Sequence, residues 1–80
     1  MDKEWYMMEE KMSTVVLSSK IREYRVEKSI SQERLGELLG VSAQAVSKWE
    51  RGICYPDISF LPVLAQLFEC TVNDFFETTV

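Results

Sequence analysis

Residues 32–51, QERLGELLGVSAQAVSKWER, are the most informative part of this chain about its fold. Its apolar residues follow the spacing of two short helices joined by a tight turn. Gly36 is the small residue that lets a second helix approach the first, and Gly40 tolerates the positive φ of the turn. Val46 and Trp49, three positions apart, give the second helix a face to bury. The stretch therefore predicts two helices that cross at close range.

The opposite side of that second helix is polar and free to enter a groove. It carries Gln44, Ser47, Lys48 and Arg51. Ser31 and Ser42 precede the two helices as caps, because a hydroxyl oxygen accepts from a free N–H of the first turn. Taken without the rest of the stretch, Gln44 and Lys48 are equally typical of a solvated helix face.

A helix is predicted before this pair. Leu17, Ile21 and Tyr24 form its apolar side, and Ser18 or Ser19 caps it. The helix after residue 31 has its own apolar face, for which the spacing selects Leu35, Leu38 and Leu39.

Two helices are predicted after residue 52. Asp57 or Ser59 caps the fourth helix, with Pro62 in the first turn or slightly past it, where a missing N–H costs little. Its apolar surface is made by Leu61, Leu64, Ala65, Leu67 and Phe68. A capping box over residues 71–74 opens a short fifth helix. With no strand pair in the sequence, the prediction is an all-α fold, a compact five-helix bundle.

The two ends of the chain differ from this core. Residues 1–16 are predicted to be an N-terminal extension, helical or a flexible arm, residues 17–76 the domain, and residues 77–80 a tail. Apolar side chains at helical spacing in the extension favour internal packing or a dimer contact. They are Trp5, Met8 and Met12. The fifth helix offers a second candidate dimer surface, with Val72, Phe75 and Phe76.

Composition limits the class of protein. The 80 residues have room for one small domain, and the absence of histidine removes the usual general base and the commonest metal ligand. No nucleophile–base pair or carboxylate pair stands out, so we expect no enzyme, cofactor or metal site. No apolar run approaches the ~20 residues of a membrane span. Cys54 and Cys70, without a secretory signal, predict reduced thiols packed as small apolar groups in a cytoplasmic protein.

Residues 17–76 resemble the Cro/repressor-type (XRE) helix-turn-helix DNA-binding domain. The resemblance is carried by Ser31-Gln32-Glu33, Leu39-Gly40-Val41-Ser42, the string VSKWERG at 46–52, Pro56-Asp57 and Leu67-Phe68. It implies a five-helix bundle of the lambda-repressor-like type. It also implies a bacterial or phage transcription regulator that binds a double-stranded DNA operator, commonly as a homodimer, in the cytoplasm and with the nucleoid.

The resemblance also implies roles for single positions. Gln32 and Ser42, at the starts of two helices, are expected to meet phosphates. Ala43, Gln44, Ser47 and Lys48 occupy the places that face base edges. Ala43 departs from the longer polar residue of many relatives and offers only apolar contact, for example to a thymine methyl. Gln44 suits adenine, and Lys48 reaches guanine or phosphate. Arg25 and Glu50 are expected to form an internal ion pair.

The net charge of −4 argues at first against a nucleic-acid binder, because phosphate contacts need basic side chains. The acidity lies at the ends: residues 1–16 hold two bases and four acids, and residues 69–80 hold three acids and no base. Residues 17–68 hold seven bases and six acids. We therefore expect weak non-specific affinity, with tight binding dependent on dimerisation and a matched site.

The leading hypothesis is a sequence-specific DNA-binding transcriptional regulator, a repressor acting as a homodimer with a recognition helix over residues 43–51. One alternative is an antitoxin-like module that binds DNA and a partner protein, such as a toxin or another regulator. A further alternative is a protein-interaction adaptor that has lost DNA binding, which the negative total charge favours.

Overall fold

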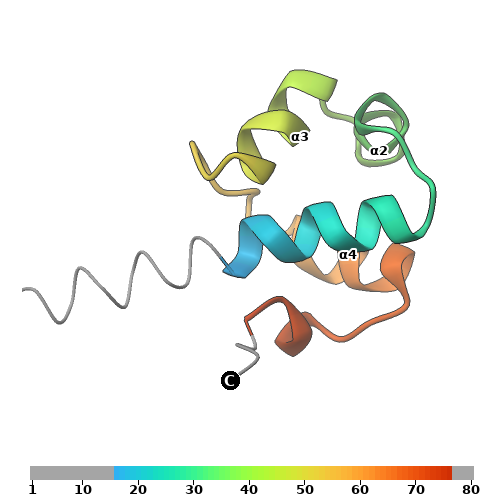
Figure 1. The fold of residues 1–80 in the computed structure, drawn as a ribbon, viewed down its shortest axis with the longest axis vertical. Helices are drawn as coiled ribbons and strands as arrows, with labels where there is room; N and C mark the ends of the chain where they lie inside the picture. Colours follow the sequence, from blue (N-terminus) through green and yellow to red (C-terminus); the bar gives the residue numbers. More distant parts are fainter. Residues whose placement is uncertain (1–15, 77–80) are drawn as a thin grey trace, which may run out of the picture.

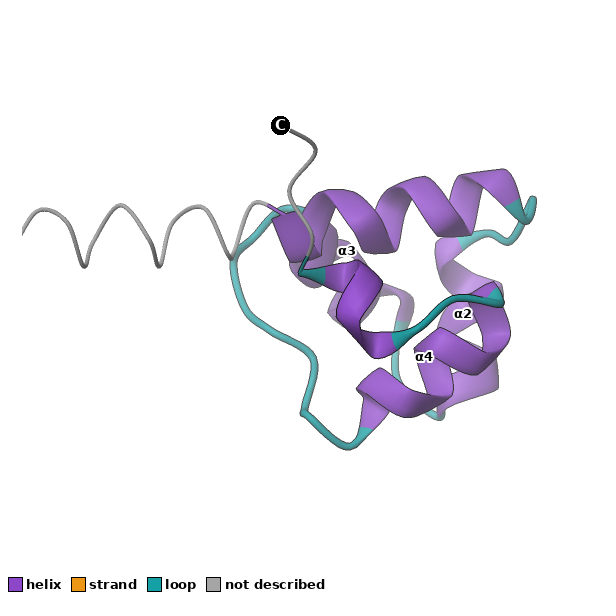
Figure 2. Cartoon of the chain, turned by 90° about the horizontal axis from the view of Figure 1, so that it is seen from below, coloured by secondary structure: helices purple, strands orange, loops and turns teal. Residues whose placement is uncertain are grey.

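The computed structural model describes residues 16–76, and all of its regular elements are helical (Figures 1 and 2). Residues 16–27 are helical and are called the N-terminal helix below. The elements that follow are α2 (Gln32–Leu39), α3 (Ala43–Glu50), α4 (Phe60–Phe68) and the 3₁₀ helix η1 (Val72–Phe75). The predicted all-α fold is confirmed over this part of the chain, with four α-helices there in place of five.

The predicted fifth α-helix is a single turn of 3₁₀ helix. Its capping box forms as expected: the Asp74 N–H donates to Thr71 Oγ1 at 3.2 Å, and the Thr71 N–H donates to Asp74 Oδ2 at 2.9 Å. The backbone bonds, however, span three residues, with the Phe76 N–H on the Asn73 carbonyl at 3.0 Å. A 3₁₀ turn is the usual form of so short a helical piece.

The N-terminal helix begins earlier than the sequence indicates. Residue 16 is already helical, so Ser18 and Ser19 lie inside the helix and do not cap it, and Ser18 is buried. The Trp5, Met8 and Met12 stripe and the tail at 77–80 lie outside the described residues.

Two helices end in a left-handed residue that is not glycine. Ser29 follows the N-terminal helix with φ 57°, and Glu69 follows α4 with φ 58°. The Ile30 N–H donates to the Arg25 carbonyl at 3.0 Å, which closes the first of these ends. The Lys28 ammonium pairs with the Glu69 carboxylate, so the two helix ends are joined.

A single apolar core joins the helices. Its buried members are Leu17, Ile21, Leu35, Val46, Trp49, Leu61, Leu64, Ala65, Phe68 and Phe75. Tyr24 packs its ring on Phe68 at 5.7 Å and on Phe75 at 6.0 Å, measured between centroids. These contacts attach η1 and α4 to the N-terminal helix. Figure 1 shows α2 and α3 at one end of the molecule and η1 at the other.

Three expectations about apolar residues are wrong. Leu38 is 41% exposed, because the contact with the core reaches only part of the α2 stripe. Phe75 is fully buried, so of the η1 dimer candidates only Val72 and Phe76 reach the surface. Cys54 is exposed on the loop after α3, whereas Cys70 packs against the core as expected.

The turn between α2 and α3 depends on two glycines for different reasons. Gly40 has φ 76°, the left-handed conformation that ends α2. At Gly36 the constraint is space: the Val41 N–H donates to the Gly36 carbonyl at 2.8 Å, and a Cβ on Gly36 would lie 2.6 Å from the Val41 carbonyl oxygen. The chain after the turn therefore crosses directly over α2 at Gly36.

Gly36→Ala is expected to lower the free energy of unfolding by about 1–3 kcal/mol, because the added methyl forces the turn backbone to move. Helix propensity alone predicts the opposite, a gain of about 0.8–1.0 kcal/mol. Urea denaturation followed by circular dichroism measures the sign. Gly40→Asn is the control, since asparagine tolerates the left-handed region and no atom lies within 4 Å of a Cβ there. A stabilised Gly36→Ala chain contradicts the close crossing.

Candidate nucleic-acid interface

The helix α3 has one buried face and one free face. Val46 and Trp49 lie in the core, and the Trp49 ring packs on Phe60 with centroids 5.8 Å apart. The Ser42 hydroxyl caps α3 by accepting from the Ala45 N–H at 3.1 Å. These contacts fix both the position of α3 and its rotation about its own axis.

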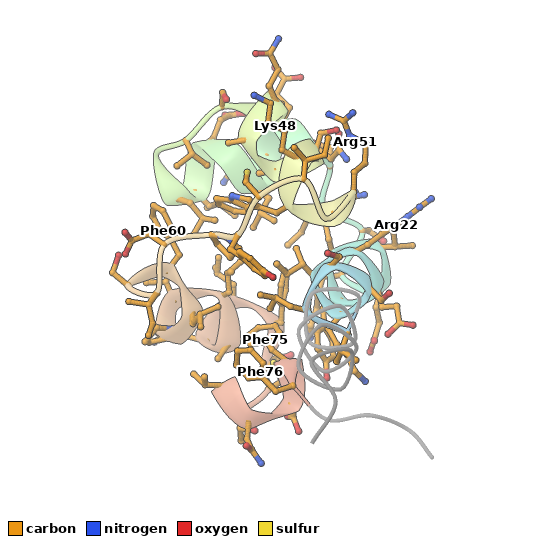
Figure 3. The ribbon with its side chains drawn as sticks, turned by 90° about the vertical axis from the view of Figure 1, so that its left-hand side faces the viewer. Arg22, Lys48, Arg51, Phe60, Phe75 and Phe76 are labelled. Carbon is orange, nitrogen blue, oxygen red and sulfur yellow. The ribbon has the colours of Figure 1, made fainter. Side chains whose placement is uncertain are left out.

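The side chains expected to face DNA lie on the other side of α3. Gln44, Lys48 and Arg51 are exposed, and Ala43 and Ser47 are half-buried. Arg51 follows the last residue of α3 as its C-cap, and its Nε donates to Ser47 Oγ at 3.1 Å. Figure 3 shows Lys48 and Arg51 at the same end of the molecule, away from Phe75 and Phe76.

Arg25, Glu50 and Gln32 come together beneath this surface, although they lie on three different helices. The Arg25 guanidinium donates through Nε and Nη2 to the two Glu50 oxygens at 2.6 and 3.0 Å, and through Nη1 to the Ile30 carbonyl at 2.9 Å. Gln32 Nε2 donates to Glu50 Oε1 at 3.1 Å. The hydrogen bond with Glu50 raises the pKa of Arg25, which favours the charged form of the guanidinium.

The sequence reasoning missed Arg22. It lies outside the helix-turn-helix stretch, on the N-terminal helix, three residues before Arg25 and therefore on nearly the same side of that helix. Its side chain is exposed, and Figure 3 shows it extending on the side of the molecule where Arg51 lies. The spacing from Arg25 is the signal that could have identified it.

Two further features are absent from residues 16–76, a group of metal ligands and a membrane-spanning helix. No three His, Cys, Asp or Glu side chains are grouped to hold a metal ion in that range. None of the helices described there is long and apolar enough to cross a membrane.

Two short helices crossing at a tight turn, with the outer face of the second left polar and exposed, define a helix-turn-helix protein. The family model described as helix-turn-helix matches residues 21–75. The chain belongs to this family, in the XRE-type class that its sequence resembles.

Its relatives include regulators of transcription. The chain is 37% identical over 57 residues to the HTH-type transcriptional activator BcrR of Enterococcus faecalis, covering 71% of this chain and 28% of BcrR. It is 35% identical over 60 residues to repressor protein C2 of Salmonella phage P22, covering 75% of this chain and 28% of C2. The chain thus spans less than a third of these two proteins. The chain is 32% identical over 60 residues to the HTH-type transcriptional regulator YgzD of Bacillus subtilis. This match covers 75% of the present chain and 91% of YgzD.

A solved structure has the same fold. The P22 c2 repressor, crystallised in complex with a synthetic operator, superposes with a TM-score of 0.70 at 31% identity, over 76% of this chain and 92% of that one.

Proposed function

We propose that this chain is a sequence-specific DNA-binding transcriptional regulator, a repressor that acts as a homodimer with α3 in the major groove. The observation that carries the proposal is the division of α3 into a buried face at Val46 and Trp49 and an exposed polar face. A helix fixed in this way fits the major groove, which is about 12 Å wide. The fold shared with a repressor crystallised on its operator supports the same function.

The exposed face supplies the groups that read bases. The Gln44 amide has both a donor and an acceptor, which matches adenine, and Lys48 reaches guanine or a phosphate. Ala43 offers apolar contact to a thymine methyl. Ser47 also faces a base edge, and its hydroxyl can both donate and accept. Ser42, Arg51 and the start of α2 at Gln32 contact the phosphate backbone and set the register of α3 in the groove.

The DNA-binding domain is proposed to span residues 17–76, in a cytoplasmic protein associated with the nucleoid. Val72 and Phe76, exposed on η1, remain candidates for the dimer surface. Because residues 17–68 carry nearly equal numbers of acids and bases, one domain alone binds DNA weakly, and two domains on a matched site bind tightly.

Selection of bound sequences from random double-stranded DNA tests the function. We expect two half-sites about 34 Å apart, two chains per site by sedimentation, and binding at least about 10³-fold tighter than to scrambled DNA. Transcription from a promoter that overlaps the selected site should fall when the chain is added. Failure to enrich any sequence at micromolar protein contradicts the proposal and favours the adaptor alternative.

The exposed Arg22, on the same side of the molecule as Arg51, is proposed to contact a DNA phosphate (Figure 3). Arg22→Gln is therefore expected to weaken binding to selected and scrambled DNA alike, because a phosphate contact carries no sequence information. Each lost cationic contact makes the fall of log affinity with log salt concentration less steep, by about 0.9 per chain. Lys20→Gln is the matched control on the same helix. It removes the same charge two positions away, about 200° around the helix axis. An equal change of slope in both variants shows that Arg22 contributes only to the net charge.

A further inference from the structure

Glu50 has a contact beyond its ion pair. Its carboxylate is held by Arg25 and also accepts from Gln32 Nε2 at 3.1 Å, although Gln32 lies 18 positions earlier in the chain. The Glu50 side chain is only 4% exposed, whereas Gln32 is half-buried at the first residue of α2. A buried carboxylate therefore contacts a half-buried side chain at the start of α2.

A carboxylate determines which way a glutamine amide points. It accepts hydrogen bonds and donates none, so only the NH₂ side of the Gln32 amide can face Glu50. The same nitrogen carries a second N–H, which is left for another acceptor. Because Gln32 opens α2, that N–H lies at a helix N-terminus, where an anion is favoured.

Arg25 makes this arrangement stable. It neutralises the Glu50 charge, which would otherwise repel a nearby phosphate, and it holds both carboxylate oxygens. Its third bond, to the Ile30 carbonyl, anchors the guanidinium to the backbone just before α2. The Glu50 acceptor is thus fixed relative to the start of α2.

We propose that Glu50 is a positioning residue for DNA binding: it holds the Gln32 amide so that the second N–H donates to a DNA phosphate. This inference rests on the proposed function. It assigns Glu50 a role that acts through Gln32 and that the ion pair with Arg25 alone does not require. Because Gln32 is neutral, its contact adds affinity without adding to the salt dependence.

A double-mutant cycle on the selected DNA tests the proposal. Glu50→Gln keeps the shape of the side chain, but the new amide both donates and accepts, so Gln32 is free to turn over. We expect binding to weaken by about 10- to 150-fold per chain, the effect of one hydrogen bond to a charged group. The loss should be the same on selected and scrambled DNA, with an unchanged salt slope. Gln32→Ala should cause the same loss, and adding Glu50→Gln to it should cause no further loss.

A second variant separates positioning from folding. Arg25→Met combined with Glu50→Leu replaces the buried pair with apolar side chains of similar volume, which often preserves stability. This chain should fold as well as the parent and still bind DNA about as weakly as Gln32→Ala. Gln66→Ala, an exposed glutamine on α4, is the control and should bind normally.

The side-chain amide of Gln32 gives a readout without DNA. Its NH₂ resonances should be slow to exchange in the parent chain and should lose that protection in Glu50→Gln. Two results overturn the positioning role while the proposed function stands. One is that Gln32→Ala combined with Glu50→Gln binds DNA more weakly than either single variant. The other is that Arg25→Met combined with Glu50→Leu binds DNA as tightly as the parent chain. A parent chain that selects no DNA overturns the proposed function itself.

Discussion

Arg25→Met is expected to lower the free energy of unfolding by about 3–5 kcal/mol, because it leaves the Glu50 carboxylate buried without its cation. The carboxylate is 4% exposed, so water cannot replace the guanidinium, and the Gln32 amide is the partner that remains. A chain of this size has a total stability of only about 4–12 kcal/mol. Urea denaturation followed by circular dichroism measures the loss.

Two further variants identify the cause of that loss. Arg25→Met with Glu50→Leu should recover most of the stability, since no buried charge is left unpaired. Lys28→Met breaks the exposed pair with Glu69 and should leave the unfolding midpoint almost unchanged, because solvent screens that pair. If Arg25→Met and Lys28→Met have the same small effect, burial of the Arg25–Glu50 pair does not determine stability.

Gln44→Ala combined with Lys48→Ala is expected to remove sequence preference. Each base contact contributes about 1–3 kcal/mol, so two contacts in each of two chains cost about 4 kcal/mol or more, close to a 10³-fold loss of affinity. Both side chains are exposed, and the core contacts of α3 are made by Val46 and Trp49, so the fold should be unaffected. Titration of selected and scrambled DNA by fluorescence anisotropy measures the difference.

The matched control removes the same two residue types elsewhere. Lys20→Ala with Gln66→Ala loses one lysine and one glutamine on the N-terminal helix and α4. Neither residue belongs to the helix-turn-helix stretch of residues 32–51. This control should keep its preference for the selected site. Unchanged specificity in Gln44→Ala with Lys48→Ala excludes α3 as the reading helix.

Apart from the caps expected at Ser18 or Ser19, the local signals at the helix ends of residues 31–42 were interpreted correctly. Ser31 and Ser42 cap their helices, and Gly40 takes the left-handed turn, because each of these features depends on a few neighbouring residues. Less local features were missed. Ser29 and Glu69 take left-handed conformations that usually indicate glycine, and Leu38 is exposed although its spacing fits the apolar face.

Part of the candidate DNA-binding site could be predicted from local sequence, and part of it depends on packing between helices. The outer face of α3, with Gln44 and Lys48, follows from helical periodicity once the inner face is known. Periodicity within α3 cannot place Arg22, because that residue reaches the same side of the molecule only through the packing of another helix. The contact between Gln32 and Glu50 likewise joins two helices, and no local sequence pattern predicts it.

The helix-turn-helix could be predicted from residues 32–51 alone, because their glycines, caps and apolar spacing act over one or two helical turns. The tertiary structure was needed to show that Leu38 and Cys54 are exposed and that Gln32 joins the ion pair of Arg25 and Glu50, which the family resemblance had predicted. Those outcomes depend on packing between helices distant in sequence. The pair of Arg25 and Glu50, 25 positions apart, is formed by that packing, and it brings the start of α2 and the end of α3 together in one surface.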